Sequence, residues 1–106
     1  MSANHERWHG PIVTVALSGD IDHRNAHEIV YRVAGVVNRG ARRVVVDLEA
    51  VDFMDAAALG ALVRSRNLSR PHGANVRVRC SDRRFRRLFV LTGLGKLLEV
   101  NDVPGR

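Results

Sequence analysis

An alternation of β-type and α-type apolar patterns along the chain constrains its fold more than any other feature. Residues 12–17 (Ile-Val-Thr-Val-Ala-Leu) are rich in strand formers and end before Gly19. Residues 44–48 form an apolar run broken only by Asp47, typical of a strand buried on both faces, and residues 76–80 alternate with period two. Helical 3.6-residue spacing fills the intervals. This order predicts an α/β layer with parallel strands joined by right-handed crossovers.

Three helices are expected between and after these strands. The first uses apolar residues from 26 to 37, with Asn25 as N-cap, Glu28 completing a capping box, and Gly40 beyond its end. The second begins after Asp55 and closes before residue 71, and the third covers residues 85–92 with residue 81 or 82 as cap. We also expect a short strand near residues 7–9, a strand or helical turn at 97–100, and a loose tail.

Bulk properties predict one domain over residues 1–106. The chain is 45% hydrophobic, enough for one ordinary core. No apolar stretch approaches the roughly 20 residues of a membrane span, so no membrane partner is expected. The charged N-terminus is not a signal peptide, and the single Cys80 has no disulfide or metal-spaced partner. These features predict a soluble cytoplasmic protein.

The formal net charge of +6 raises the question of nucleic-acid binding. Sixteen of the 17 basic residues are arginines, and they are dense only from Arg77 to Arg87. Aromatic residues make up 5% of the chain, which leaves little for base stacking. We therefore favour a solvated basic face over nucleic-acid binding, with recruitment of an acidic protein partner as a further use of the charge.

The chain lacks an evident catalytic or cofactor set. His23 and His27 are one helical turn apart, but no third metal ligand follows at a useful spacing, although Asp20 and Asp22 are near. Cys80 ends a predicted strand and is expected to be a core thiol. Neither GxxxxGK[ST] nor GxGxxG is present. We therefore expect no metal, no cofactor and no enzymatic activity.

The junction after residues 44–48 is the strongest candidate site. Open α/β sheets present their sites where a strand's carboxyl end meets a helix amino terminus. Asp55 can cap that helix, with a loss of about 1 kcal/mol on removal. Asp52 lies three residues before it, and residues 56–58 are all alanine. Alanines here either allow a partner to approach closely or pack against neighbouring loops, and residue chemistry alone leaves both interpretations open.

The run VVVDLEAVDFMDAAALGALV at residues 44–63 resembles the signature of the STAS domain family, particularly its stand-alone anti-sigma factor antagonists. In that family the strand ends in Asp-Leu and is followed by Phe-Met-Asp-Ser-Ser-Gly-Leu-Gly. LSGDID at 17–22 is similar to the family's Gly-x-Leu-Asp turn, and FRRLFVLTGLGKLLEV at 85–100 is similar to its closing segment. The matches span about residues 10–100 in the family's order.

The resemblance implies four or five mixed strands covered mainly on one face by helices. It also implies partner switching, in which the antagonist binds an anti-sigma factor that is itself a serine kinase. Phosphorylation of a serine breaks that complex by adding about −1.5 to −2 charge to an interface shaped for a hydroxyl.

Carried over by position, the aspartate is Asp55 and the phosphorylated serine falls on Ala57. The acceptor hydroxyl is therefore absent, and the alanine at position 58, where the family has glycine, is expected to add a methyl group to the surface. If the chain is phosphorylated nonetheless, the acceptor must be another hydroxyl, for example that of Ser65, Ser69 or Thr92. The expected partner-binding surface comprises Asp20, Asp22, His23, Asp55, Ala56, Ala57, Ala58, Leu59, Gly60, Arg64 and Asn67.

Several alternatives remain at this level. A STAS scaffold subunit of a signalling complex or of a lipid-transport ATPase would also need a binding face without an acceptor serine. A nucleic-acid binder would use residues 77–87 and lose affinity steeply with salt. A nucleotide-binding module would place phosphate at the helix amino terminus, where the acidic residues oppose it. Whether the chain is a monomer or a weak dimer stays open.

Overall fold

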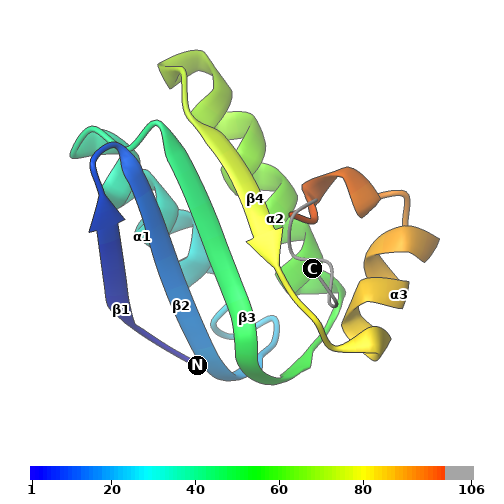
Figure 1. Cartoon of the computed structure of the whole chain (residues 1–106). Helices are drawn as coiled ribbons and strands as arrows, with labels where there is room; N and C mark the ends of the chain where they lie inside the picture. Colours follow the sequence, from blue (N-terminus) through cyan, green and yellow to red (C-terminus); the bar gives the residue numbers. More distant parts are fainter. Residues whose placement is uncertain (100–106) are drawn as a thin grey trace.

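The computed structural model of the protein describes residues 1–99, which form one four-stranded sheet with helices α1 and α2 on one face (Figure 1). The strands are adjacent in chain order: β1 (Ser2–His9), β2 (Ile12–Ile21), β3 (Arg43–Met54) and β4 (Asn75–Arg79). β1 is antiparallel to β2, whereas β2, β3 and β4 are parallel. The predicted mixed α/β sheet is confirmed, with four strands in the described part of the chain.

β1 is longer than the sequence predicted. It begins at Ser2 instead of near Arg7, and it joins β2 through a tight turn at Gly10, whose φ is +57°. A positive φ favours glycine, which has no Cβ to clash with the backbone. Because an edge strand can be largely polar, its composition gives little of the apolar signal used to find strands.

Two helices follow β2 and β3 and lie side by side over the sheet. α1 spans His27–Asn38, and α2 spans Ala56–Ser69 and continues into a 3-10 turn, η1 (Arg70–His72). The first helix ends where predicted, but its predicted capping box is wrong. The residue at its N-cap is Ala26, and the Asn25 side chain instead bonds within the preceding loop.

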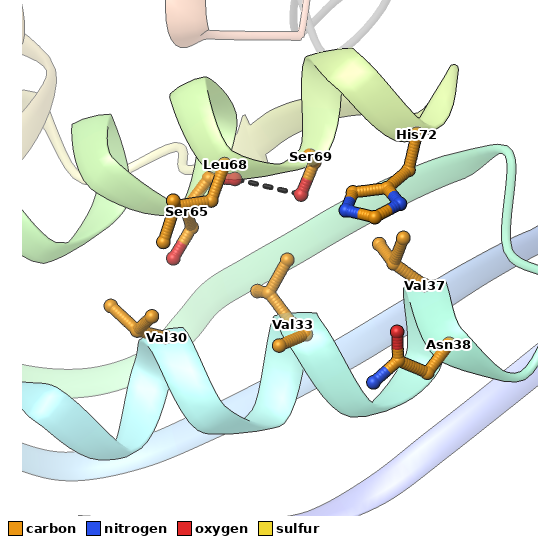
Figure 2. A pocket seen from close by; sticks show the side chains of 9 residues that line it. Val30, Val33, Val37, Asn38, Ser65, Leu68, Ser69 and His72 are labelled. Atoms are coloured by element: carbon orange, nitrogen blue, oxygen red, sulfur yellow. Dashed lines mark hydrogen bonds between the residues drawn. The ribbon is translucent and has the colours of Figure 1, made fainter.

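A hollow of about 130 Å³ separates the carboxyl-terminal halves of α1 and α2 (Figure 2). On one side it is lined by valines of α1, including Val33 and Val37, and on the other by Ser65 and Ser69. Both hydroxyls donate to main-chain oxygens one turn earlier, Ser65 to Ala61 (2.8 Å) and Ser69 to Ser65 (2.7 Å). Because these two side chains are small and turn back to their own helix, the space between the helices stays unfilled.

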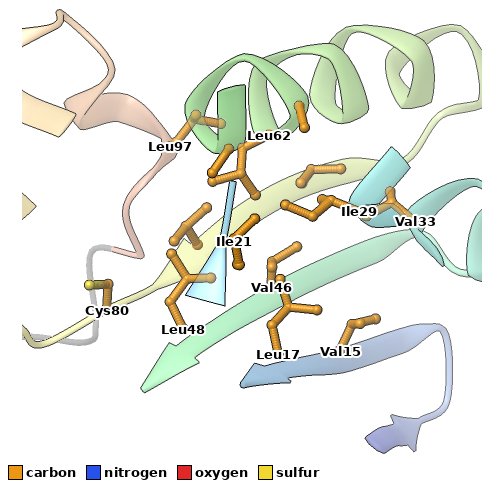
Figure 3. Packing of buried hydrophobic residues seen from close by; sticks show 14 of the residues in the cluster. Val15, Leu17, Ile21, Ile29, Val33, Val46, Leu48, Leu62, Cys80 and Leu97 are labelled. Atoms are coloured by element: carbon orange, nitrogen blue, oxygen red, sulfur yellow. The ribbon is translucent and has the colours of Figure 1, made fainter. Parts of the chain in front are cut away.

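The core lies between these helices and the sheet (Figure 3). Alternate residues of β2 and β3 point toward the helices, as period-two strands require. Each fully buried large aliphatic side chain contributes roughly 1.5–3 kcal/mol. Side chains exposed by 1% or less include Val13, Val15, Leu17, Ile29, Val33, Val44, Val46, Leu48 and Leu62.

The other face of the sheet explains why three consecutive residues of β3, 44–46, are all valine. Val45 points away from the core cluster, yet it is only 3% exposed. Its neighbours across the sheet are Thr14 on β2 and Arg77 on β4, and we attribute its burial to their side chains. β3 is therefore buried on both sides at Val45, whereas on the side away from α1 and α2 Asp47 is half-buried and Glu49 is exposed.

A third helix, α3 (Arg83–Leu91), lies beyond β4 and is followed by a 3-10 turn, η2 (Gly95–Leu97). Asp82 is its N-cap, as predicted. Leu98 then forms a single parallel bridge with Val78, so the expected element at 97–100 is a helical turn plus one bridge in its described part. Val100 and the tail expected to be loose, residues 101–106, lie outside the described residues. No helix within residues 1–99 is long and apolar enough to cross a membrane.

Candidate protein-binding site

The carboxyl ends of β2 and β3 meet at one edge of the sheet and bring two loops together. Ile21 pairs in register with Met54, and the Asp55 backbone N–H donates to the Ile21 carbonyl at 3.2 Å. The loop at residues 22–26 therefore starts beside the first turn of α2. This is the strand-end arrangement that the sequence predicted for the site.

Asp55 holds both segments with one carboxylate. Its Oδ1 accepts from the backbone N–H groups of Ala57 (2.9 Å) and Ala58 (3.3 Å), which confirms the predicted cap. Its Oδ2 accepts from the backbone N–H of His23 at 3.2 Å, a contact across 32 residues of sequence. Because both oxygens are engaged, Asp55 acts as a clamp between the loop and the helix. The sequence predicted the cap but not the clamp.

The clamped loop is also ordered by its own side chains. Asp22 Oδ1 accepts from the Arg24 backbone N–H (2.9 Å), and its Oδ2 pairs with the Arg24 guanidinium (2.8 Å). These hydrogen bonds lower the pKa of Asp22 from 3.8 to about 2. Asn25 accepts from the Asp22 backbone N–H and donates to the Asp20 carbonyl, each at 3.0 Å. The side chains of Asp20, near the end of β2, and of His23, in this loop, are exposed.

One face of α2 continues the exposed surface from the loop. Ala56, Gly60, Arg64 and Asn67 are exposed and lie three or four residues apart, so they follow one helical stripe. Ala57, onto which the resemblance maps a phosphorylated serine, is half-buried in the first turn. A Cβ built on Gly60 would have no heavy atom within 4 Å, so packing inside the described chain does not require glycine there.

Two predicted surface residues lie in the core instead. Ala58 is fully buried and Leu59 is 5% exposed. Ala58 belongs to the stripe that continues through Leu62, which faces the sheet. The expectation that the Ala58 methyl projects from the surface is therefore wrong, and neither side chain is accessible to a partner.

Sequence reasoning missed an exposed aromatic residue beside this site. Phe53 pairs in register with Asp20, and its side chain is 51% exposed. The β2–β3 register shifts between Gly19 and Asp20, and Val51 and Met54 are both buried although they are three residues apart. Regular alternation would place Phe53 on the same side as Val51. Only the irregular strand end reveals that it faces solvent.

The site offers little to a metal or a phosphate. No group of three or more His, Cys, Asp or Glu side chains within residues 1–99 could hold a metal ion. His23 lies in the loop, whereas His27 begins α1 and packs edge-to-face with Tyr31 at 5.9 Å, so the two do not share a helical face. The α2 amides that could bind a phosphate are already bonded to Asp55. Cys80 is buried, which raises its thiol pKa to about 11.

Comparison with known proteins agrees with the fold described above. Residues 7–104 match the STAS domain family. The anti-sigma-B factor antagonist of Listeria monocytogenes is 33% identical over 100 residues, covering 88% of this chain and 82% of that protein. The anti-sigma-F factor antagonist RsfA of Mycobacterium tuberculosis is 29% identical over 96 residues, covering 88% and 74%. An anti-sigma factor antagonist of known structure from Mycobacterium paratuberculosis superposes with a TM-score of 0.71 at 26% identity, covering 92% and 86%. The chain belongs to the STAS domain family.

Proposed function

We propose that this chain is a non-enzymatic protein-binding module of the anti-sigma factor antagonist type, which binds an anti-sigma factor in the cytoplasm. The observation that carries the proposal is the Asp55 clamp, which joins the loop after β2 to the start of α2. It presents exposed residues from both segments as one preformed surface. The names of the relatives at 33% and 29% identity support an anti-sigma factor as the partner.

The composition of this surface suits close approach by another protein. Gly60 lies inside a helix, where glycine is less favourable than alanine by about 1 kcal/mol. Yet a Cβ added at Gly60 would have no heavy atom within 4 Å, so packing within the described chain does not require glycine. A partner backbone that packs against Ala56 and Gly60 would account for both small residues. Phe53 provides an aromatic anchor at the edge, as protein interfaces commonly use. The proposed binding surface comprises Asp20, His23, Phe53, Ala56, Ala57, Gly60, Arg64 and Asn67. The hydrogen bonds of Asp22 and Asp55 hold it in place.

The proposed module also lacks phosphorylation control at Ala57, which has no oxygen to accept a phosphoryl group. Two of the suggested substitutes are unsuitable in the folded protein, because Ser65 and Ser69 are 2% and 3% exposed and bond to helix carbonyls. The Thr92 hydroxyl also donates to a helix carbonyl, that of Leu88 at 2.7 Å, but Thr92 is exposed and is therefore the remaining candidate of the three. We propose that the partner is an anti-sigma factor with serine kinase activity, as in partner-switching systems of this family.

Calorimetric titration against purified anti-sigma factors of the host tests the binding role. Wild type and Ala57→Ser should bind alike. Ala57→Glu should bind at least about 30-fold more weakly, because it buries an unpaired charge in the interface. A glutamate in a first helical turn interacts favourably with the helix dipole, so folding should survive. Ala34→Glu places the same charge on an exposed position of α1 and is the control.

Gly60→Ala separates function from stability. The variant should unfold at a higher urea concentration, with a free energy of unfolding about 0.5–1 kcal/mol larger than that of wild type. It should bind the partner more weakly. If wild type binds none of the host's anti-sigma factors, the binding role is wrong. If Ala34→Glu weakens binding as much as Ala57→Glu, the proposed surface is wrong.

Incubation with labelled ATP and the bound kinase tests the switch. Wild type should stay unlabelled, and Ala57→Ser should gain label. Label on the wild type that Thr92→Val removes would show that the acceptor is the residue that follows the carboxyl end of α3.

A further inference from the structure

The dense arginine run at residues 77–87 does not form a single patch. Arg77 and Arg79 lie on β4 and point away from the core, whereas Arg83, Arg84 and Arg87 lie on α3. Arg79 is engaged with Asp47 and Glu99. Arg83, Arg84 and Arg87 are exposed and stand apart from this network, whereas Arg86, also on α3, is half-buried and donates to the Cys80 carbonyl at 2.7 Å.

The solvent side of α3 combines these arginines with two exposed aliphatic residues. Val90 is 63% exposed and Leu91 is 71% exposed, while Phe85 and Phe89 on the opposite side are buried. At roughly 100° per residue, the five outward residues fall within roughly 120° of the helix circumference. We call this surface the α3 outer face; it consists of Arg83, Arg84, Arg87, Val90 and Leu91.

Much of the positive charge on this face is available to a ligand. Among residues 1–99, Arg83 and Arg87 have no hydrogen-bond or ion-pair partner for their guanidinium groups. Arg84 pairs with Asp82 at 2.9 Å but keeps 74% of its side chain exposed. A Cβ built on Gly95 would lie 3.8 Å from Val90 Cγ2, so η2, with its exposed Lys96, adjoins the same face.

The arrangement of charge and apolar surface distinguishes between possible partners. Protein interfaces are enriched in aromatic residues and methionine as well as arginine, but the α3 outer face has neither an aromatic residue nor methionine, because Phe85 and Phe89 are buried. The phosphates of a nucleic acid would bind the arginines but would leave the two aliphatic side chains without an apolar contact. Arginines bind lipid phosphates while neighbouring aliphatic side chains enter the apolar boundary beneath the headgroups.

We infer that the α3 outer face docks on the surface of a bilayer rich in anionic phospholipid. The expectation of no membrane partner rested on the lack of a spanning segment, which a surface-bound helix does not need. Because only two aliphatic side chains are free to insert, binding is reversible and depends on the anionic charge of the lipid. The α3 outer face is separate from the proposed binding surface around Asp55. The inference does not depend on the proposed anti-sigma factor role.

Co-sedimentation of the full chain with vesicles tests the inference. Binding to vesicles of equal parts phosphatidylglycerol and phosphatidylcholine should exceed binding to pure phosphatidylcholine by at least about tenfold. It should fall in high salt, which shortens the Debye length from about 10 Å at 0.1 M to about 3 Å at 1 M. Equal binding to both kinds of vesicle, or none, would overturn the inference.

Variants locate the contact. Arg83→Glu with Arg87→Glu should weaken binding at least about 25-fold, at about fivefold per arginine. Arg42→Glu with Arg70→Glu makes the same change in net charge away from α3 and should bind more tightly than that variant by about tenfold or more. Equal losses in the two variants would show that overall charge, not this face, attracts the lipid.

The aliphatic residues separate lipid from other polyanions. Val90→Ser with Leu91→Ser should reduce vesicle binding several-fold without changing the net charge, and circular dichroism should show an intact fold. If this variant binds vesicles as well as wild type does, insertion is wrong. If duplex DNA binds wild type more tightly than anionic vesicles do, the occupant is nucleic acid and the inference fails.

Discussion

The amino termini of α2 and α3 are both capped by an aspartate, but the two caps connect different parts of the molecule. Asp55 accepts from two amides of its own helix and from the His23 amide, 32 residues away. Asp82 accepts from the Arg84 amide at 2.8 Å and pairs with the guanidinium of the same residue. A local cap stabilises one helix end, whereas the Asp55 cap also fixes the relative position of the loop after β2 and the start of α2.

The helices also differ in how they are held. α2 packs beside α1 over the middle of the sheet, while α3 lies past the edge strand β4 (Figure 1). Phe85 and Phe89 are the buried residues of α3, at 7% and 0% exposure. Attachment of α3 should therefore depend on these two rings more than on its aspartate cap.

Removal of the more deeply buried anchor of α3 should have the largest effect on stability. Phe89→Ala should lower the free energy of unfolding by about 3–5 kcal/mol, because it removes a fully buried ring and leaves a cavity. Urea denaturation followed by circular dichroism measures the change. A loss below about 1 kcal/mol would mean that α3 is not anchored through the core.

Loss of the α2 clamp should rank second. Asp55→Ala should lower the free energy of unfolding by about 2 kcal/mol, because it releases two helix amides and the His23 amide. Amide hydrogen exchange should accelerate at both His23 and Ala57. Faster exchange at Ala57 alone would show that the clamp does not order the loop.

The cap of α3 should matter less. Asp82→Ala should destabilise the protein by less than Asp55→Ala does, because its bonds stay within one exposed turn. Exchange should accelerate at Arg84 and stay unchanged at His23. A loss equal to that of Asp55→Ala would remove the distinction between a local cap and a tertiary one.

The sequence predicted most of the fold because its signals are local. The caps at Asp55 and Asp82 and the end of α1 near Gly40 are encoded within a few residues of each element. The polar strand β1 was underestimated because its position depends on pairing with β2, not on its own apolar residues. Asn25 was wrongly predicted to cap α1. Its bonds to Asp22 and Asp20 depend on the shape of the loop, which the local sequence does not show.

The site was predicted less completely than the fold. The strand–helix junction and its loop were found from their positions, but the exposure of each residue was not. Ala58 and Leu59 turn inward because the helix phase is set by packing on the sheet, and Phe53 turns outward because β3 ends irregularly. Such effects depend on tertiary contacts, which a motif cannot specify.

The loop after β2 and the start of α3 share one local arrangement, in which an aspartate bonds to the arginine two residues later. Acid titration would measure how much the Asp22 pair stabilises the loop that Asp55 holds. Asp22 binds the amide and guanidinium of Arg24 as Asp82 binds those of Arg84, and both carboxyl pKa values are lowered. The Asp22 pKa falls from 3.8 in the unfolded chain to about 2 when folded. The charged form therefore adds stability that is complete above about pH 4 and is lost as pH falls through about 2.

Asp22→Asn should accordingly melt at a lower temperature than wild type above about pH 4, and the difference should close as pH approaches about 2. The effect should be the smallest of the four, because Asp22 lies in an exposed ion pair. Melting curves followed by circular dichroism across this range measure it. Asp20→Asn is the control, since the Asp20 carboxylate has no bond to another described residue and its removal should not produce the same convergence. A difference that widens toward low pH would show that the Arg24 pair does not stabilise the loop. The order held by Asp55 would then be sufficient to present the binding edge.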